Sequence, residues 1–538
     1  MVTVRIFFRY LLVLTLVSAG GCKALEPGLA SATAGPLYQL QATPARDTLK
    51  ATATGKLARL LEDPAAEQVT LINANLHLLD AHIKTLTVSV PGGNAVQFNQ
   101  RRAGTVFENI DGWVGYRPND WKSKTGSTAE IPVDPLYYLS VVRNGEKIWA
   151  NLTLGGQPYR IEPIEGKQHV LVKIDESKLP KEAEPIREQV DVVEPVPLRE
   201  PSPAQSVIRV LFVTTNQLRE RYPDFYEKTL LALQDANQYL ENSQVNARYE
   251  NAGFFSASYD EGSKDTKTML YDMKNNGPAL GAAIHTVRED RRADLVSMLI
   301  VNYEYCGYAF IDSSKSSAFS TVSCYGVLAH ELGHNFGAGH NNEGEKSSYD
   351  YGYRHPEDPR FRTIMSYGCA TSCPEIAYHS NPRLTYQGQP MGTVAHNDVA
   401  RRFNDRRETV ANFYENYTPV TITLYKGENY QSQICSFTAE VGHYYSFNDS
   451  HPCVAAREEV RSMKVRGFRG DLRYYVYIEG PKGTIPNGYF GNYVGDFDVP
   501  SLRYSAPGSL PEGLKRVPNL FGTAMIRLGL TDGGPQNK

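Results

Sequence analysis

The eleven residues HELGHNFGAGH, at positions 330–340, constrain the fold of this 538-residue chain more than any other stretch. His330 and His334 are four residues apart, so on a helix their rings project from the same side, one turn from each other. Gly337 can adopt a positive φ and end the helix, which lets the chain fold back and bring His340 to the other two. The stretch therefore predicts a helix that ends in a sharp bend, with three imidazoles converging beside it.

Three imidazoles with one open position are a typical donor set for catalytic zinc. We therefore predict one catalytic Zn²⁺ bound by His330, His334 and His340. Glu331 follows His330, so its side chain projects in a different direction from the two histidines of the helix and can approach the open position. Zinc lowers the pKa of a bound water to about 7, and a nearby carboxylate can take its proton and pass it to a leaving amine. The predicted reaction is hydrolysis of a peptide bond, with Glu331 as general base. Whether a structural Ca²⁺ is also bound cannot be read from the sequence.

The same stretch resembles the signature HExxHxxGxxH of the metzincin zinc endopeptidases, which is followed by a methionine turn. Met365 follows His340 by 25 residues, within TIMSYG. The resemblance implies that Met365 packs beneath the histidines and that Tyr367 stabilises the tetrahedral intermediate. It covers residues 207–417, is strongest in 326–393, and is closest to bacterial members of the reprolysin-like type. The expected fold is a metzincin-like α/β (α+β) catalytic domain with a twisted mixed sheet and an active-site helix.

Other segments bear on substrate binding and on regulation. CGYAFI, at 306–311, lies where metzincins carry an edge strand, so the resemblance implies that protein or peptide substrates bind extended along it. The residue after the third histidine marks the metzincin subfamily, and here it is Asn341, which leaves the subfamily open. No cysteine lies between Cys22 and Cys306, so the cysteine that keeps many metzincins latent is absent. Latency would need a carboxylate or steric blocking.

The pattern along the chain predicts an α/β domain flanked by two β-rich domains. Residues 207–417 contain buried strands and amphipathic helices, whereas residues 61–181 and 418–538 consist of short runs that alternate apolar and polar. The first β-rich region is interpreted as either a propeptide or a permanent accessory domain. Residues 182–206 are rich in Pro and Glu and predict an extended linker that proteases can cut. Residues 23–60 are rich in Ala, Gly and Thr and predict a flexible tether.

The first 22 residues predict export. Arg5 and Arg9 precede a short apolar core, and SAGGC ends at Cys22 and resembles a bacterial lipobox. Two forms stay open: a lipoprotein of the bacterial cell envelope, the outer membrane included, attached by lipid at Cys22, or an ordinary secreted protein.

The remaining cysteines support export, because disulfides form outside the cytosol. Of the seven cysteines, the six beyond Cys22 form local pairs, although six cysteines allow 15 connectivities. The predicted disulfides are Cys306–Cys324, Cys369–Cys373 and Cys435–Cys453. A thiol metal site is the alternative for the second pair.

These patterns favour an exported zinc metalloendopeptidase. The net charge of −3, without a long basic run, gives no indication of nucleic-acid binding. One alternative is a cell-surface adhesin or binding protein in which the β-rich domains carry the main function. Another is a zinc hydrolase that acts on something other than peptides. The presence of both Glu331 and Tyr367 favours proteolysis. Cleavage preference, physiological substrate and oligomeric state are not readable from the sequence.

Overall fold

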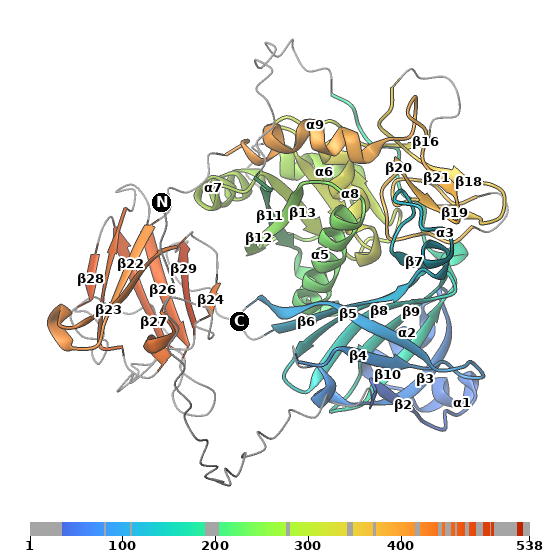
Figure 1. Cartoon of the computed structure of the whole chain (residues 1–538), viewed down its shortest axis with the longest axis horizontal. Helices are drawn as coiled ribbons and strands as arrows, with labels where there is room; N and C mark the ends of the chain where they lie inside the picture. Colours follow the sequence, from blue (N-terminus) through green and yellow to red (C-terminus); the bar gives the residue numbers. More distant parts are fainter. Residues whose placement is uncertain are drawn as a thin grey trace, which may run out of the picture.

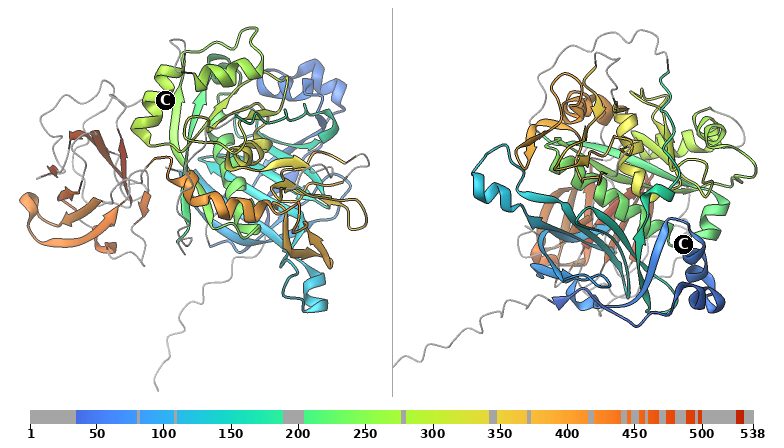
Figure 2. Two further views of the ribbon diagram at one scale, coloured as in Figure 1. Left: turned by 90° about the horizontal axis from the view of Figure 1, so that it is seen from above. Right: turned by 90° about the vertical axis from the view of Figure 1, so that its right-hand side faces the viewer.

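The computed structural model describes residues 35–188, 204–414 and parts of 420–530, apart from short gaps at 80–81, 108–109, 276–279, 342–347 and 370–372. The predicted signal peptide and Cys22 lie outside the described residues. Figure 1 shows a large sheet next to an α/β unit, and Figure 2 shows that the C-terminal strands are set apart from both. In the described part of the chain, no helix is long and apolar enough to cross a membrane.

The N-terminal unit is built on one ten-stranded sheet, in the order β1-β4-β5-β6-β7-β8-β9-β10-β3-β2. Neighbouring strands are antiparallel, except that β1 and β4 are parallel. The strands are β1 (Gly35–Pro36), β2 (Tyr38–Leu40), β3 (Ala66–Ala74), β4 (Thr85–Val88), β5 (Val96–Phe107), β6 (Ile110–Pro118), β7 (Val133–Asn144), β8 (Lys147–Leu154), β9 (Gln157–Pro163) and β10 (His169–Ile174). A short helix, α3 (Asp120–Thr125), follows β6.

The flexible tether predicted for residues 23–60 is wrong for its described part, from residue 35 onward. Helices α1 (Arg46–Thr52) and α2 (Gly55–Glu62) pack on β3 and β10, where Leu60 and Leu61 are buried. β1 and β2 join the sheet in the same region of the chain. The helices have only 7 and 8 residues, so the periodic apolar pattern that reveals a helix is too brief to detect.

The α/β unit contains a five-stranded sheet in the order β12-β11-β13-β15-β14. Its first four strands are parallel, and β14 is antiparallel to β15 at the edge. The strands are β11 (Ser206–Thr214), β12 (Ala247–Ser256), β13 (Leu295–Leu299), β14 (Gly307–Ala309) and β15 (Phe319–Val322). The helices are α4 (Asn216–Arg221), α5 (Phe225–Asn242), α6 (Thr266–Lys274), α7 (Gly281–Arg291), α8 (Leu328–Phe336) and α9 (Val399–Ala411). The predicted mixed α/β organisation is therefore confirmed.

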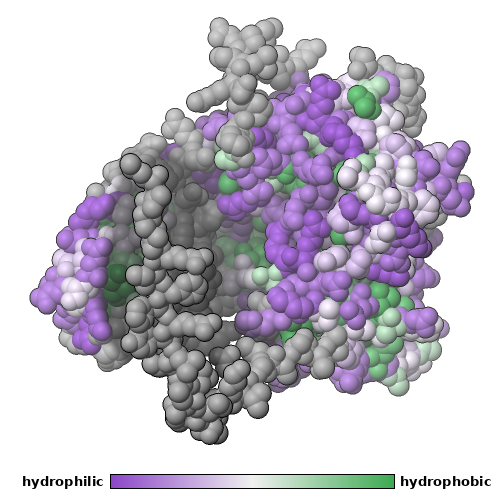
Figure 3. All heavy atoms as spheres, in the orientation of Figure 1, coloured by the Kyte–Doolittle hydropathy of each residue, from purple (hydrophilic) through white to green (hydrophobic). Residues whose placement is uncertain are grey.

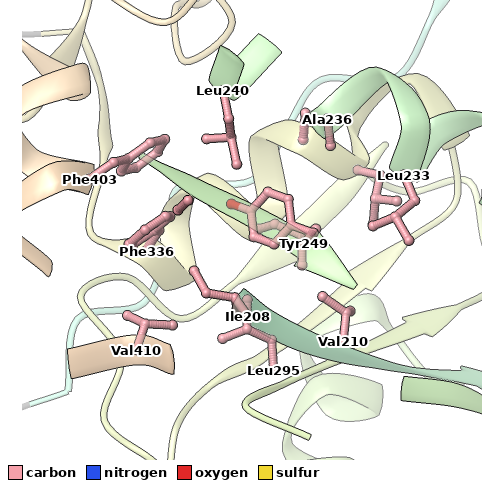
Figure 4. Close-up of a cluster of buried hydrophobic side chains, with 14 of the residues drawn as sticks. Ile208, Val210, Leu233, Ala236, Leu240, Tyr249, Leu295, Phe336, Phe403 and Val410 are labelled. Carbon is pink, nitrogen blue, oxygen red and sulfur yellow. The ribbon is translucent and has the colours of Figure 1, made fainter. Parts of the chain in front are cut away.

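In the core of this unit, α8 packs on the sheet and on two other helices, α5 and α9. Figure 4 shows Phe336, at the end of α8, beside Phe403 of α9 and close to Leu240 of α5. The rings of Phe336 and Phe403 stack, with centroids 4.4 Å apart and planes at 9°. Ile208 and Val210, from β11, belong to the same buried cluster. Since α8 carries the HELGH residues, this packing fixes their position relative to the sheet.

Helix α5 is shared between the α/β unit and the ten-stranded sheet (Figure 1). Its Leu230 and Leu231 pack in one buried cluster with side chains of β5 to β8. Its Asp235 accepts hydrogen bonds from the Tyr138 hydroxyl (2.8 Å) and the Asn151 amide (2.6 Å) of the sheet. Burial raises the pKa of Asp235 to about 6. The two units are therefore joined by a buried interface, and the face that Figure 3 shows is mainly hydrophilic over both.

The remaining strands form small sheets. Three two-stranded pairs follow α8: β16 (Gly339–Asn341) with β17 (Tyr351–Gly352), β18 (Arg354–His355) with β19 (Phe361–Arg362), and β20 (Asn381–Tyr386) with β21 (Gln389–Met391). Beyond residue 420 lie two four-stranded sheets, in the orders β23-β22-β25-β28 and β24-β29-β26-β27. Their strands are β22 (Val420–Tyr425), β23 (Gln433–Ala439), β24 (Tyr444–Ser446), β25 (Ser462–Arg466), β26 (Arg473–Glu479), β27 (Gly488–Val494), β28 (Phe497–Val499) and β29 (Met525–Leu530).

Candidate metal centre and active site

The helical period of α8 places its apolar side chains and its functional side chains on different sides of the helix. Leu328, Leu332 and Phe336 recur every four residues and are buried in the core against the five-stranded sheet. His330 and His334, offset from that row by two residues, therefore project from another side of the helix. The helix is therefore anchored to the core by this apolar row, and the two histidines lie outside it.

Gly337 ends α8 in a way that other residues could not. Its φ is 111°, in the left-handed region, and its N–H donates to the Gly333 carbonyl at 3.0 Å. A Cβ at this position would lie 2.8 Å from Nε of Arg402. The bend leads directly into β16, which carries His340. The left-handed conformation therefore favours glycine here, and a Cβ would in addition displace arginine side chains of α9.

We expect Gly337→Ala to lower the free energy of unfolding by about 1–3 kcal/mol, because it forces a side chain into a left-handed conformation. Chemical denaturation at equilibrium measures this. Gly326→Ala is the matched control, because a Cβ there would meet nothing within 4 Å. Equal stability of the two variants would show that the bend does not depend on glycine.

The bend brings the three histidines together. Nε2 of His340 lies 2.9 Å from Nε2 of His330 and 2.9 Å from Nε2 of His334. All three side chains are buried. In the described residues, this is the one group of three or more His, Cys, Asp or Glu side chains placed to hold a metal ion.

The hydrogen bonds of the other ring nitrogens test whether this group fits a metal. Nδ1 of His330 donates to the Ile364 carbonyl (2.8 Å), and Nδ1 of His334 donates to the Ala338 carbonyl (2.7 Å). In neutral rings these bonds leave Nε2 as a bare acceptor. Burial lowers the pKa of His330 to about 4 and holds that of His334 well below its usual range. Two nitrogens bound at about 2.0–2.1 Å to one zinc ion lie on the order of 3 Å apart, so the donor set fits Zn²⁺.

Glu331 is a buried carboxylate without a partner. Neither of its oxygens has a hydrogen bond in the described structure. It packs against the backbone of β14, where a Cβ on Gly307 would lie 2.3 Å from its Oε1. Burial, with a smaller contribution from Glu182, raises the pKa of Glu331 well above its usual value. A buried carboxylate without a partner lowers the stability of the fold, but its raised pKa is appropriate for a proton acceptor that works near neutral pH.

The methionine and tyrosine of the downstream turn lie at the same centre. Met365 is fully buried beneath α8, with Sδ 2.6 Å from where a Cβ on Gly333 would be. The ring of Tyr367 packs on His340, with centroids 3.9 Å apart. The Tyr367 N–H donates to Oδ1 of Asn341 at 3.3 Å. Asn341, which follows the third histidine, therefore helps to position Tyr367.

Residues 181–188, which we call the strap, run along the exposed edge of β14. The sequence assigns most of this segment to the linker, but here it is packed against the α/β unit. The backbone hydrogen bonds are Cys306 N–H to Lys181 O (3.0 Å), Ala183 N–H to Gly307 O (3.2 Å), Ile186 N–H to Ala309 O (3.0 Å) and Ile311 N–H to Ile186 O (2.9 Å). Ile186 pairs with Phe310 in the parallel direction. The edge expected to bind substrate is therefore occupied by the chain itself.

The strap also brings acidic side chains to the centre. Oε1 of Glu184 accepts a hydrogen bond from the Tyr367 hydroxyl at 2.7 Å, and its Oε2 lies 3.6 Å from Nδ1 of His340. Burial and this contact raise the pKa of Tyr367. Glu182 stands two residues earlier, on the same side of an extended segment. The two-residue spacing of these acids is the one local sequence signal that both face the same side, and it does not indicate where the strap binds.

Two disulfides brace the region. Cys306–Cys324 connects the residue before β14 to the residue before the turn that leads into α8. Cys369–Cys373 closes the segment after Tyr367. With Cys435–Cys453, all three disulfides predicted from sequence proximity are present. The second bridge excludes the thiol metal site that was the alternative for Cys369 and Cys373.

A cavity of about 1220 Å³ lies between the metal centre and the ten-stranded sheet. Its wall includes Tyr367 and Ala329 from the α/β unit, and Glu182 from the strap. Arg362 and Glu375 also face it, and they form a close ion pair. No motif in the sequence pointed to this pair.

The chain is similar to known metallopeptidases. A reprolysin-type family model, described as metallo-peptidase family M12, matches residues 204–380. A peptidyl-Asp metalloendopeptidase of Stenotrophomonas maltophilia (strain R551-3) is 32% identical over 340 residues, which cover 60% of this chain and 81% of that protein.

A peptidyl-Asp metalloendopeptidase of Xanthomonas campestris pv. campestris is 30% identical over 407 residues, covering 72% of this chain and 95% of that protein. Among solved structures, the crystal structure of metalloproteinase-II from Bacteroides fragilis overlaps 49% of this chain and 84% of its own, with 11% identity and a TM-score of 0.31.

Proposed function

Because the chain belongs to metallopeptidase family M12 and is a zinc metalloendopeptidase, we propose that it is exported, that it cleaves peptide bonds next to aspartate, and that its strap keeps it latent. The observation that carries the proposed latency is the strap on the edge of β14, where Glu184 accepts a hydrogen bond from the Tyr367 hydroxyl. Glu331, buried without a partner beside three converging imidazoles, is proposed as the general base. The choice of aspartate follows the names of the two relatives.

The three histidines would hold the zinc ion, which when bound supplies an acidified water and polarises the carbonyl of the substrate. Glu331 accepts the proton of the attacking water on one of its free oxygens and donates it to the nitrogen of the leaving amine. The substrate lies extended along β14, in the place that the strap now fills, and donates and accepts backbone hydrogen bonds there. Met365 supports the histidines from below as a packed apolar floor.

Tyr367 is proposed to donate its hydroxyl hydrogen to the oxygen on which negative charge develops. In the present structure that hydroxyl is engaged by Glu184, so the strap withholds it. We expect Tyr367→Phe to lower kcat by about 10–10²-fold, less than the loss of about 10²–10³-fold for a sole donor, because the metal, when bound, would share the charge. Initial rates at saturating peptide measure this, and an unchanged kcat would remove Tyr367 from the mechanism.

Latency rests on two features of the strap. It occupies the edge of β14 through four backbone hydrogen bonds, and Glu184 holds the hydroxyl of Tyr367. A covalently attached strap binds with an effective concentration near the millimolar range, so weak contacts suffice to keep it in place. Cleavage within residues 189–203 would turn the strap into a separate ligand that can leave.

Export is proposed from the residues before Cys22 and from the three disulfides, which suit an oxidising compartment. Attachment by lipid at Cys22 and simple secretion remain two forms of the same proposal. Mass spectrometry of the N-terminal peptide from the native host distinguishes them, because a diacylglyceryl cysteine is heavier than an unmodified one.

The test of the proposed function is digestion of a peptide library derived from a whole proteome. The sample is the nicked chain, by which we mean the full chain cut within residues 189–203 and then diluted so that the strap can dissociate, with both pieces present. We expect cleavage next to aspartate that a zinc chelator abolishes and added Zn²⁺ restores. Absence of chelator-sensitive cleavage, in nicked and intact chain alike, would overturn the proposal and favour a binding protein.

A further inference from the structure

Arg362 is a cation placed beside the metal centre. It ends β19 and lies two residues before Ile364, whose carbonyl accepts the hydrogen bond from His330. Its side chain is only 12% exposed and faces the cavity next to the histidines. The mechanism above does not use it. A largely buried guanidinium at this position calls for an explanation, because a charge is rarely buried without a partner.

One side of the guanidinium is held within the α/β unit. Arg362 and Glu375 are paired residues of neighbouring segments, with backbone hydrogen bonds from Arg362 N–H to the Pro374 carbonyl (2.9 Å) and from Ile376 N–H to the Arg362 carbonyl (2.9 Å). Nη1 of Arg362 forms a close ion pair with Glu375. These contacts fix the direction in which the guanidinium points.

The other side is occupied by acids from the N-terminal part of the chain. Nη2 of Arg362 lies 3.4 Å from Oε1 of Glu176, a residue that precedes the strap and is 39% exposed. Glu182, in the strap, also acts on Arg362 through its charge. Both acids lie before the proposed cleavage region, so both leave when the strap leaves. Nη2 then faces the space that the N-terminal part has vacated, with no partner from the α/β unit among the contacts described here.

From this arrangement we propose that Arg362, oriented by Glu375, recognises an acidic side chain of the substrate next to the cleaved bond, and that Glu176 and Glu182 stand in its place in the intact chain. The inference rests on the proposed function and deepens it, because it assigns the preference for aspartate to one residue. A carboxylate of the substrate replaces those of the N-terminal part and forms a charge-assisted hydrogen bond with Nη2. An asparagine or alanine at that position leaves the guanidinium half-paired, and a site built around a charged group rejects such analogues.

The test compares two fluorogenic peptides that differ only by Asp or Asn at the position next to the cleaved bond. The nicked chain is used, and the readout is the ratio of kcat/KM for the two peptides. We expect a ratio of at least about tenfold in the unmodified protein. Arg362→Gln should bring the ratio to within about twofold of one, mainly by slowing cleavage of the Asp peptide. Arg401→Gln, which removes a half-exposed arginine of α9, should leave the ratio unchanged.

Each outcome decides something. If the ratio of kcat/KM is unchanged in Arg362→Gln, the inference is overturned, because a residue with only a structural role affects the cleavage of both peptides equally. Chelator-sensitive cleavage without any preference for Asp overturns the inference and leaves the zinc endopeptidase in place. If Arg362→Gln fails to fold, as thermal unfolding would show, Arg362→Lys decides: an ammonium cannot pair with Glu375 and the substrate in the same planar geometry, so the ratio should fall at least about threefold. An unchanged ratio in Arg362→Lys would overturn the inference.

Discussion

Glu331→Gln is expected to lower kcat/KM of the nicked chain by about 10²–10⁴-fold, the range for loss of a general base. Glutamine has the same shape and fits against Gly307, but it cannot accept the proton of the attacking water. Binding of zinc should persist, because the metal ligands are the three histidines. Rates with a fluorogenic peptide, together with zinc content from atomic emission, measure both.

The same substitution should not weaken the fold. The carboxylate of Glu331 is buried without a hydrogen bond, so a neutral amide removes the cost of desolvating a charge. We expect an unchanged or higher thermal midpoint, which is the usual signature of a group kept for function. Glu357→Gln, at an exposed position, is the control and should change neither rate nor stability. Full activity in Glu331→Gln would rule out Glu331 as the base.

Cutting the chain within residues 189–203 is expected to raise activity by at least about 10²-fold after dilution. The strap loses its covalent attachment, so its effective concentration falls from the millimolar range to that of the sample. Dilution is needed because the N-terminal part also packs on α5, through Leu230, Leu231 and Asp235. The rate per molecule of the cut protein should therefore rise as the sample is diluted, whereas the rate per molecule of the intact chain should not.

Variants of the strap separate latency from other effects of cutting. Glu184→Gln in the intact chain weakens the contact with Tyr367 and should raise residual activity severalfold, to a level well below that of the cut chain. Glu188→Gln, at the end of the strap and paired with Lys274 away from the histidines, is the control. Equal activity of intact and diluted cut chain would show that the strap does not block the site.

What the sequence could predict was governed by short-range geometry. The spacing of His330 and His334, together with Gly337, determines local directions on one helix and at its end, so the cluster followed from the sequence. The disulfides joined cysteines that are near in sequence. The position of Met365 came from a resemblance, because its packing against Gly333 links two separate segments.

What the sequence could not predict depends on long-range packing. Tyr367 and Glu184 are 183 residues apart and meet only because the strap binds to β14. Arg362, at the end of the two-residue strand β19, and Glu375, in an isolated bridge, belong to segments whose pairing has no periodic pattern. The composition of residues 182–206 predicts an extended linker, whereas the described residues 182–188 bind along the edge of β14, because a segment without a core of its own can still add as a strand to an exposed edge.

The central claim is that the three histidines hold one zinc ion on which activity depends. The most direct measurement is a titration of Zn²⁺ into metal-free nicked chain, with bound zinc and peptide cleavage followed in the same sample. We predict that activity rises in proportion to bound zinc and reaches its limit at about one ion per chain, the stoichiometry of a mononuclear catalytic site. His334→Ala should bind no zinc at this site and should remain inactive. Cleavage by the metal-free protein at the full rate, or in His334→Ala, would contradict the account.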